Sequence, residues 1–255
     1  MLLRSISKHV KEQNWFAVAL DFFIVIVGIL IAFQISNWNE TRLDQKAYEQ
    51  AHDRMVIEAK NNIETLENTL AINAPMMENF QNAIKDIKEC RDDEAAKERI
   101  DAAVESLNST ISPKYHNTVI THLTTSERLL ERQTTERREL YLEYSKSLSA
   151  RMKWSQTMFE NMEARLNDSH PFLDYGFFKV TTDDINWKEA VLGDYRPLVL
   201  VVEPAKACQD TTFRKLFYRW ESGHTYQKNL MTAVVADTNI FLEELGEGQA
   251  TGTGQ

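Results

Sequence analysis

The sequence predicts an all-α protein, with one N-terminal transmembrane helix followed by an extramembrane antiparallel bundle of long helices. Glycine (8) and proline (5) are scarce, which disfavours a turn-rich sandwich or barrel. One apolar stretch has the length of a membrane span, and apolar residues recur at helical spacing through most of the remaining chain. The predicted organisation is a short cytoplasmic N-terminus (1–13), a transmembrane helix (14–38), a helical extramembrane domain (39–245) and a disordered tail (246–255).

The expected anchor is residues 16–33, FAVALDFFIVIVGILIAF, in which Asp21 is the single charge. A helix needs about 20 such residues, at about 1.5 Å each, to cross the hydrocarbon core. Trp15 and Trp38 bracket the stretch, and we expect them to be its anchors at the two membrane interfaces. The run is longer than that of a secretory signal peptide, and no small-x-small cleavage site follows it. We therefore expect the helix to remain uncleaved.

The charges that flank the anchor favour a cytoplasmic N-terminus. Arg4, Lys8 and Lys11 cluster before it, whereas residues 40–46 mix both signs. Because basic residues are retained on the cytoplasmic side, the large domain is expected on the opposite side.

Small and polar residues share one face of the expected span. At about 100° per residue, the members of this face fall within a narrow arc. They are Asn14, Ala17, Asp21, Gly28 and Ala32, and Ser36 continues the series. Small residues at this spacing let two helix backbones approach closely, so the stripe predicts a partner helix, either from another copy of the chain or from a different membrane protein.

Asp21 is expected inside the membrane, because a span that began after it would be too short for the core. A carboxylate there costs about 2.5 to 3.5 kcal/mol and therefore tends to face protein or water. We favour a role in packing or at the interface over proton transport.

Beyond the anchor, the chain is expected to stay helical, with apolar residues that form a heptad-like seam. The seam consists of Ile63, Leu66, Leu70, Met77, Phe80, Ile84 and Ile87. Pro75 interrupts it without shifting its phase, so we expect either a kink or a tight helix-to-helix turn at residues 73–75.

The next elements are a short helix near residues 93–107, a loop at 108–113, and a long helical signal from Val119 to Leu166 with a break allowed at residues 124–126. Residues 167–171 are expected to end that helix.

The last third of the sequence is expected to be less regular until its closing helix. The run at 197–202 predicts a buried strand or loop, and Asp183 and Asp184 are suited to capping a short helix. Residues 213–245 predict the closing helix, where Phe213, Phe217, Tyr218 and Trp220 favour core packing over a binding site.

Composition and motifs argue against several functions. The net charge of -9 and the lack of a basic cluster interleaved with aromatics argue against a nucleic-acid partner. The run Glu136-Arg137-Arg138-Glu139 is better explained as a solvated helix face. The six histidines have no metal-ligand spacing, and no nucleophile elbow, P-loop or dinucleotide motif occurs. We therefore expect no catalytic residues, no metal and no cofactor.

The two cysteines, Cys90 and Cys208, are too few for a disulfide framework. They pair if the domain lies in an oxidising compartment, and two unpaired buried thiols are an equally good expectation.

The N-terminal segment 11–42 resembles the start of a family of uncharacterised bacterial single-span membrane proteins, a domain of unknown function. The likeness is a QNW…DF…G…Q…NWNE string, occupied here by Gln13-Asn14-Trp15, Asp21-Phe22, Gly28, Gln34 and Asn37-Trp38-Asn39-Glu40. A weaker likeness covers Tyr115 to Tyr144, where this chain has Ser126-Glu127 in place of the family's frequent Ser-Gly. The resemblance implies an inner-membrane location and a helical extramembrane region, which would then be periplasmic, and it brings no assigned activity.

The function expected from these features is that of a noncatalytic membrane-anchored scaffold or interaction protein. Two alternatives remain. One is an ion-coupled accessory subunit that uses Asp21, similar in shape to the stator partners of flagellar and Tol/Ton-type motors but without a recognisable cell-wall-binding domain. The other is a helical ligand sensor that acts through a partner.

Overall fold

The computed structural model describes residues 15–107, 113–166, 170–177 and 196–247, and within them the chain is all-α apart from one small two-stranded sheet. The elements are α2 (Trp15–Glu89), α3 (Glu94–Ser106), α4 (Thr118–Thr125), α5 (Glu127–Leu130), α6 (Thr135–Leu166), β1 (Leu173–Tyr175), β2 (Leu198–Leu200), α7 (Pro204–Ala207) and α8 (Thr211–Leu245). The predicted fold class is confirmed.

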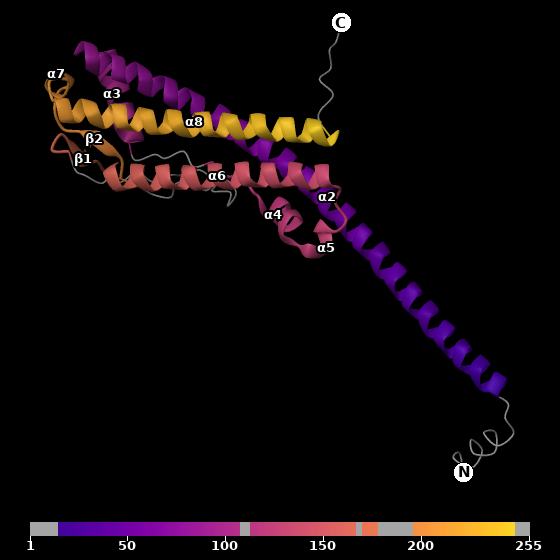
Figure 1. Ribbon diagram of the computed structural model, residues 1–255. Helices are drawn as coiled ribbons and strands as arrows, with labels where there is room; N and C mark the ends of the chain where they lie inside the picture. The colour runs from indigo at the N-terminus through magenta and orange to yellow at the C-terminus, as the bar shows by residue number, and fades with distance from the viewer. Residues whose placement is uncertain (1–14, 108–112, 167–169, 178–195, 248–255) are drawn as a thin grey trace, which may run out of the picture.

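Helix α2 is one uninterrupted helix of 75 residues, about 110 Å long at 1.5 Å per residue. Its first third projects from the bundle as a free rod, and the rest lies against the other helices (Figure 1). The helix runs on through residue 38, the predicted end of the membrane segment, and the chain beyond the anchor is helical as expected. It also continues through Pro75, so the alternative of a helix-to-helix turn at residues 73–75 is wrong.

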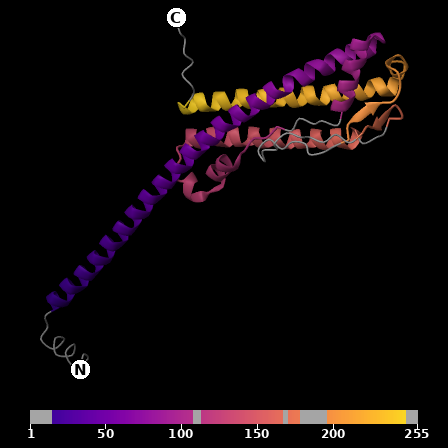
Figure 2. The ribbon, with the colours of Figure 1, turned by 180° about the vertical axis from the view of Figure 1, so that it is seen from behind.

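The bundle is formed by α2, α6 and α8. Helices α6 and α8 lie side by side in both views, with α2 crossing them (Figures 1 and 2). Contacts between α6 and α8 run in opposite directions along the two helices: Tyr144 Oη lies 3.1 Å from Thr238 Oγ1, and Ser155 Oγ donates to Gln227 Oε1 at 3.0 Å. This pairing makes α6 and α8 antiparallel, as the sequence predicted for the long helices.

The centre of the core is aromatic. Phe80 of α2 is fully buried and stacks on Trp220 and Phe217 of α8, with ring centroids 3.9 Å and 5.1 Å apart. The predicted seam on α2 faces this core: Leu66, Met77, Phe80 and Ile87 are buried, and its other members pack against them half-buried. Phe213, Phe217 and Trp220 are likewise core residues, as predicted, whereas Tyr218 is exposed.

The long helical signal from Val119 to Leu166 is divided into α4, α5 and α6. The allowed break is confirmed at Ser126, which ends α4 and precedes α5 with extended backbone angles (φ -80°, ψ 112°). Glu127 stands where the resembling family often carries glycine, and it is the first residue of α5. Among the described residues other than glycine, only Cys90 has a positive φ, so position 127 does not need glycine.

The run at 197–202 contributes strand β2, which pairs antiparallel with β1. A side chain at Gly176 would place its Cβ 2.9 Å from Val199 Cγ1, so a larger residue where the chain leaves β1 would have to displace the Val199 side chain. The expected loop at 108–113 lies mostly outside the described residues. Of the segment 167–171 that was expected to end the long helix, residues 167–169 lie outside the described residues, as do the expected capped helix at 183–187 and residues 248–255 of the expected tail. Gly246, the first residue of that tail, is the left-handed cap of α8.

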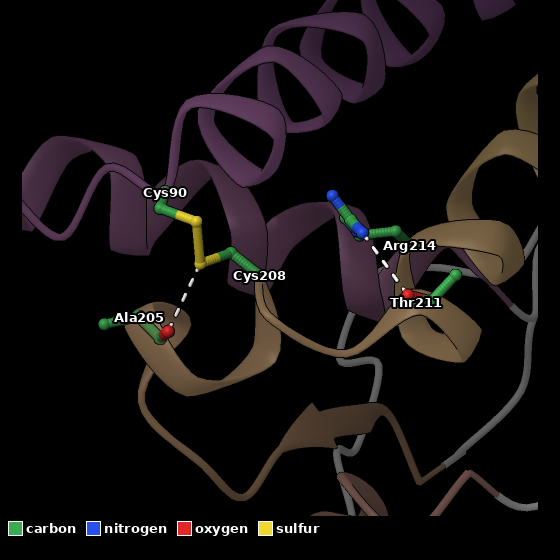
Figure 3. The surroundings of a disulfide bond; sticks show 5 residues. All are labelled: Cys90, Ala205, Cys208, Thr211 and Arg214. Carbon is green, nitrogen blue, oxygen red and sulfur yellow. Dashed lines mark hydrogen bonds between the residues drawn. A yellow bond between two sulfur atoms is a disulfide. The ribbon is translucent and has the colours of Figure 1, made fainter.

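The two cysteines form a disulfide that ties the C-terminal end of α2 to α7 (Figure 3). Cys90 follows the last residue of α2 with φ 52°, and its N–H and that of Arg91 donate to the carbonyls of Ile87 and Asp86. This is a Schellman cap whose left-handed position is usually glycine. Of the two open alternatives, the structure has the paired cysteines.

Candidate functional site

The first third of α2 has the length and the exposure of a membrane span. The residues from Trp15 to Trp38 cover about 35 Å of helix, against a hydrocarbon core of about 30 Å. None of the most apolar part of this segment is buried inside the protein, and its large side chains, such as Phe22 at 67% and Phe33 at 68%, are exposed. An apolar surface of this size needs lipid or another protein to cover it.

The predicted polar stripe lies on this exposed segment. Asp21, Gly28, Ala32 and Ser36 are all exposed, and no hydrogen bond or ion pair to Asp21 is found among the described residues. A Cβ added at Gly28 would meet no atom within 4 Å, so nothing inside the folded chain requires a glycine there. Asn14 lies outside the described residues. Ala17 lies within α2, but its side chain is outside what the structure describes.

Both predicted interface tryptophans are exposed, Trp15 at 69% and Trp38 at 65%. The Arg42 guanidinium lies over the Trp38 ring, 5.6 Å from its centroid, and donates to Asn39 Oδ1 at 3.4 Å. A cation above an indole suits the headgroup layer, where the ring is in apolar surroundings and the charge stays hydrated.

The bundle contacts α2 within two turns after Trp38. Asp44, about 9 Å of helix past Trp38, is buried and forms an ion pair with Arg128 of α5. The carboxylate is 11% exposed and the guanidinium 56%, so the acid depends on its partner and the base remains hydrated. The pair attaches α5 to α2 at the end of the bundle nearest the span.

A second contact lies two turns further along α2. His52 Nδ1 lies 2.7 Å from the fully buried Tyr141 Oη on α6, and Tyr48 Oη lies 3.4 Å from the same hydroxyl. Burial lowers the pKa of His52 below its usual value of 6.5, and the charge of Arg137 lowers it further, against the opposing effects of Asp53 and Glu247. This histidine is therefore disposed to stay neutral where it joins the helices.

Sequence reasoning missed both contacts. Asp44 was one of several mixed charges after the span, and His52 was one of six scattered histidines. Their partners are 84 and 89 residues away along the chain, so no local spacing signals either pair.

One hollow in the bundle surface is lined by both apolar and polar side chains. It has a volume of about 410 Å³ and lies between α6 and the segment before α4, with Tyr115, Asn117, Ser149, Lys153 and Gln156 among its lining residues. In the part of the chain that the structure describes, no three His, Cys, Asp or Glu side chains are grouped so as to hold a metal ion.

Comparison of the chain with protein-family models, with curated proteins and with solved structures finds no match. The described residues therefore define the class of this protein by geometry alone. They form an all-α fold in which one helix is long and apolar enough to cross a membrane, which is compatible with a single-pass membrane protein.

Proposed function

We propose that this chain is a noncatalytic, single-pass scaffold or interaction protein of the bacterial inner membrane, with a cytoplasmic N-terminus and a periplasmic helical bundle. The observation that carries the proposal is the continuity of α2, whose exposed apolar third runs without a break into the buried core of the bundle. A rigid connection of this kind fixes the height and direction of the bundle relative to the bilayer.

The disulfide supports the proposed topology. Bonds of this kind persist in oxidising compartments such as the periplasm and are rare in the reducing cytoplasm. Cys90 and Cys208 both belong to the large domain, so their pairing agrees with the side that the basic residues before the span assign to it. The resemblance of segment 11–42 to a family of bacterial single-span proteins agrees with the same location, and we propose membership in that family.

The stripe of Asn14, Ala17, Asp21, Gly28, Ala32 and Ser36 is the proposed contact for a partner helix, from a second copy or from another membrane protein. The open surroundings of Gly28 favour this, because a small residue there is of use only to a neighbour outside the chain.

A Gly28→Cys variant in native membranes tests this contact by oxidative crosslinking, with the exposed Phe33→Cys as the control on a lipid-facing position. We expect an adduct from position 28 and much less from position 33. A variant that stays strictly monomeric, with no adduct to any protein, would overturn the proposal.

The hollow beside Tyr115, with its mixed polar and apolar lining, favours one alternative, a helical ligand sensor that acts through a membrane partner. Its volume is at the small end of known ligand sites, and the Tyr115 hydroxyl is buried with no hydrogen-bond partner among the described residues. The ion-coupled alternative depends on Asp21. If Asp21→Asn fully complements a deletion strain, proton coupling through this residue is excluded.

A further inference from the structure

The solvent face of α2 beyond the span carries a strip of uncharged residues. It is exposed along its whole length and lies opposite the face that packs into the bundle. At about 100° per residue, its members fall within about 60° of one another around the helix axis. The uncharged members are Asn39, Leu43, Gln50, Ile57, Asn61, Asn68, Ile72, Pro75 and Asn79.

Charged residues border this strip but do not occupy its centre. Lys46, Asp53 and Glu64 lie along one side, and Arg54 lies at the other edge, at the same angle as Ile72. An exposed helix face of an acidic protein is ordinarily rich in charge, so an uncharged centre with charged borders is the pattern of a helix-pairing seam.

The strip also contains all the strongly exposed large aliphatic side chains of α2 beyond the span. These are Leu43 at 47%, Ile57 at 58% and Ile72 at 77%. The same arc continues into the span as the face of Asp21, Ala32 and Ser36. One unpartnered line therefore runs along α2 from inside the expected membrane to Asn79.

We infer that a second copy of this chain covers the strip, so that two α2 helices pack in parallel from the membrane outward, with the two bundles on opposite sides. This inference rests on the proposed membrane insertion and extends its helix contact beyond the bilayer. Two copies inserted in the same way are parallel and at the same depth, so each strip residue faces its own counterpart.

Self-facing explains the composition of the strip. Asn and Gln carry both a donor and an acceptor and can bond to an identical side chain, and Leu and Ile bury surface against themselves. A charged residue at the centre would face its own charge and repel it. Asn in the seam of a parallel helix pair also fixes its register, which suits a contact that must match one level in the bilayer.

The test is oxidative crosslinking of full-length single-cysteine-addition variants in native membranes. Ile57→Cys and Asn68→Cys lie on the strip, and Glu49→Cys is an equally accessible control about 80° away from Ile57 around the helix. All three positions are exposed, so these variants keep the fold, and the native cysteines are already paired. We expect several-fold more dimer-sized adduct from Ile57→Cys and Asn68→Cys than from Glu49→Cys.

The outcomes separate this inference from the proposed function. If Gly28→Cys crosslinks but Ile57→Cys and Asn68→Cys do not, the extramembrane contact is overturned and the membrane contact stands. If the strip variants give an adduct with a different protein, the assignment of a second copy of this chain as the partner is overturned. Equal adducts at positions 49 and 57 would reflect collision and would also overturn the inference. If no dimer-sized adduct forms at positions 28, 57 and 68, both the membrane contact between two copies and its extension beyond the bilayer are excluded.

Discussion

Breaking the disulfide tests how the membrane-distal end of α2 is held to the rest of the bundle. Cys90 and Cys208 are 118 residues apart, and the loop they close contains α3 to α7. In the chain-entropy description, a loop of that length destabilises the unfolded state by about 5 kcal/mol at 25 °C, and native disulfides typically contribute about 2 to 4 kcal/mol. We therefore expect the Cys90→Ser variant to lose about 2 to 5 kcal/mol of unfolding free energy.

The assay is urea denaturation of the full-length protein in detergent micelles, followed by the loss of ellipticity, with and without a reductant. Cys90→Gly is the matched variant, because it removes the same bond but places glycine at the left-handed position with φ 52°. Since a side chain in that conformation costs about 1 to 2 kcal/mol, Cys90→Gly should unfold at higher urea than Cys90→Ser. An equal midpoint for oxidised and reduced wild type would refute the reasoning that this bond limits the unfolded chain.

Three further predictions concern the contacts of α2. Arg128→Gln should destabilise the bundle more than Asp44→Asn, by about 1 to 3 kcal/mol in urea denaturation, because the first leaves a buried carboxylate unpaired and the second leaves a guanidinium that water reaches. The folded-state pKa of His52 is below 6.5, so its contribution to stability is complete above that pH and is lost as the pH falls below it; a denaturation series from pH 8 to 5 should show this loss in wild type and a shallower slope in His52→Gln. Phe80→Ala should cost about 3 to 5 kcal/mol, because it removes the ring stacked between Trp220 and Phe217, whereas Ile72→Ala on the exposed face should cost under about 0.5 kcal/mol in the monomer.

Helix periodicity predicted most of the fold because it is a local signal. The seam from Ile63 to Ile87, the short helix after residue 93 and the closing helix all appear where apolar residues recur every three or four positions. Pro75 led us to allow a helix-to-helix turn that the structure does not have, although the apolar seam on either side of it was predicted correctly. A proline removes one hydrogen bond and one N–H, and the packing of Met77 and Phe80 on one side and Leu70 on the other keeps the helix continuous through it.

Long-range contacts were beyond the reach of the sequence. The residues near Cys90 and Cys208 contain no motif that brings them together, and the pairing depends on α7 being placed at the end of α2. The ion pair of Asp44 and the hydrogen bond of His52 were unpredictable for the same reason, because only the fold brings their distant partners close. The candidate face on α2 was predictable only within the span, because beyond it the exposed side had first to be told apart from the side that packs on α8.

The central claim is that the apolar third of α2 stays on the mature protein and crosses a bilayer. Its most direct test is the intact mass of the protein recovered from alkali-washed membranes of the cells that express it. We expect the chain to stay in the washed membrane fraction with a mass of at least 29.5 kDa, the value for residues 1–255. Release of the protein into the wash, or a mass that lacks the first forty or so residues, would contradict it.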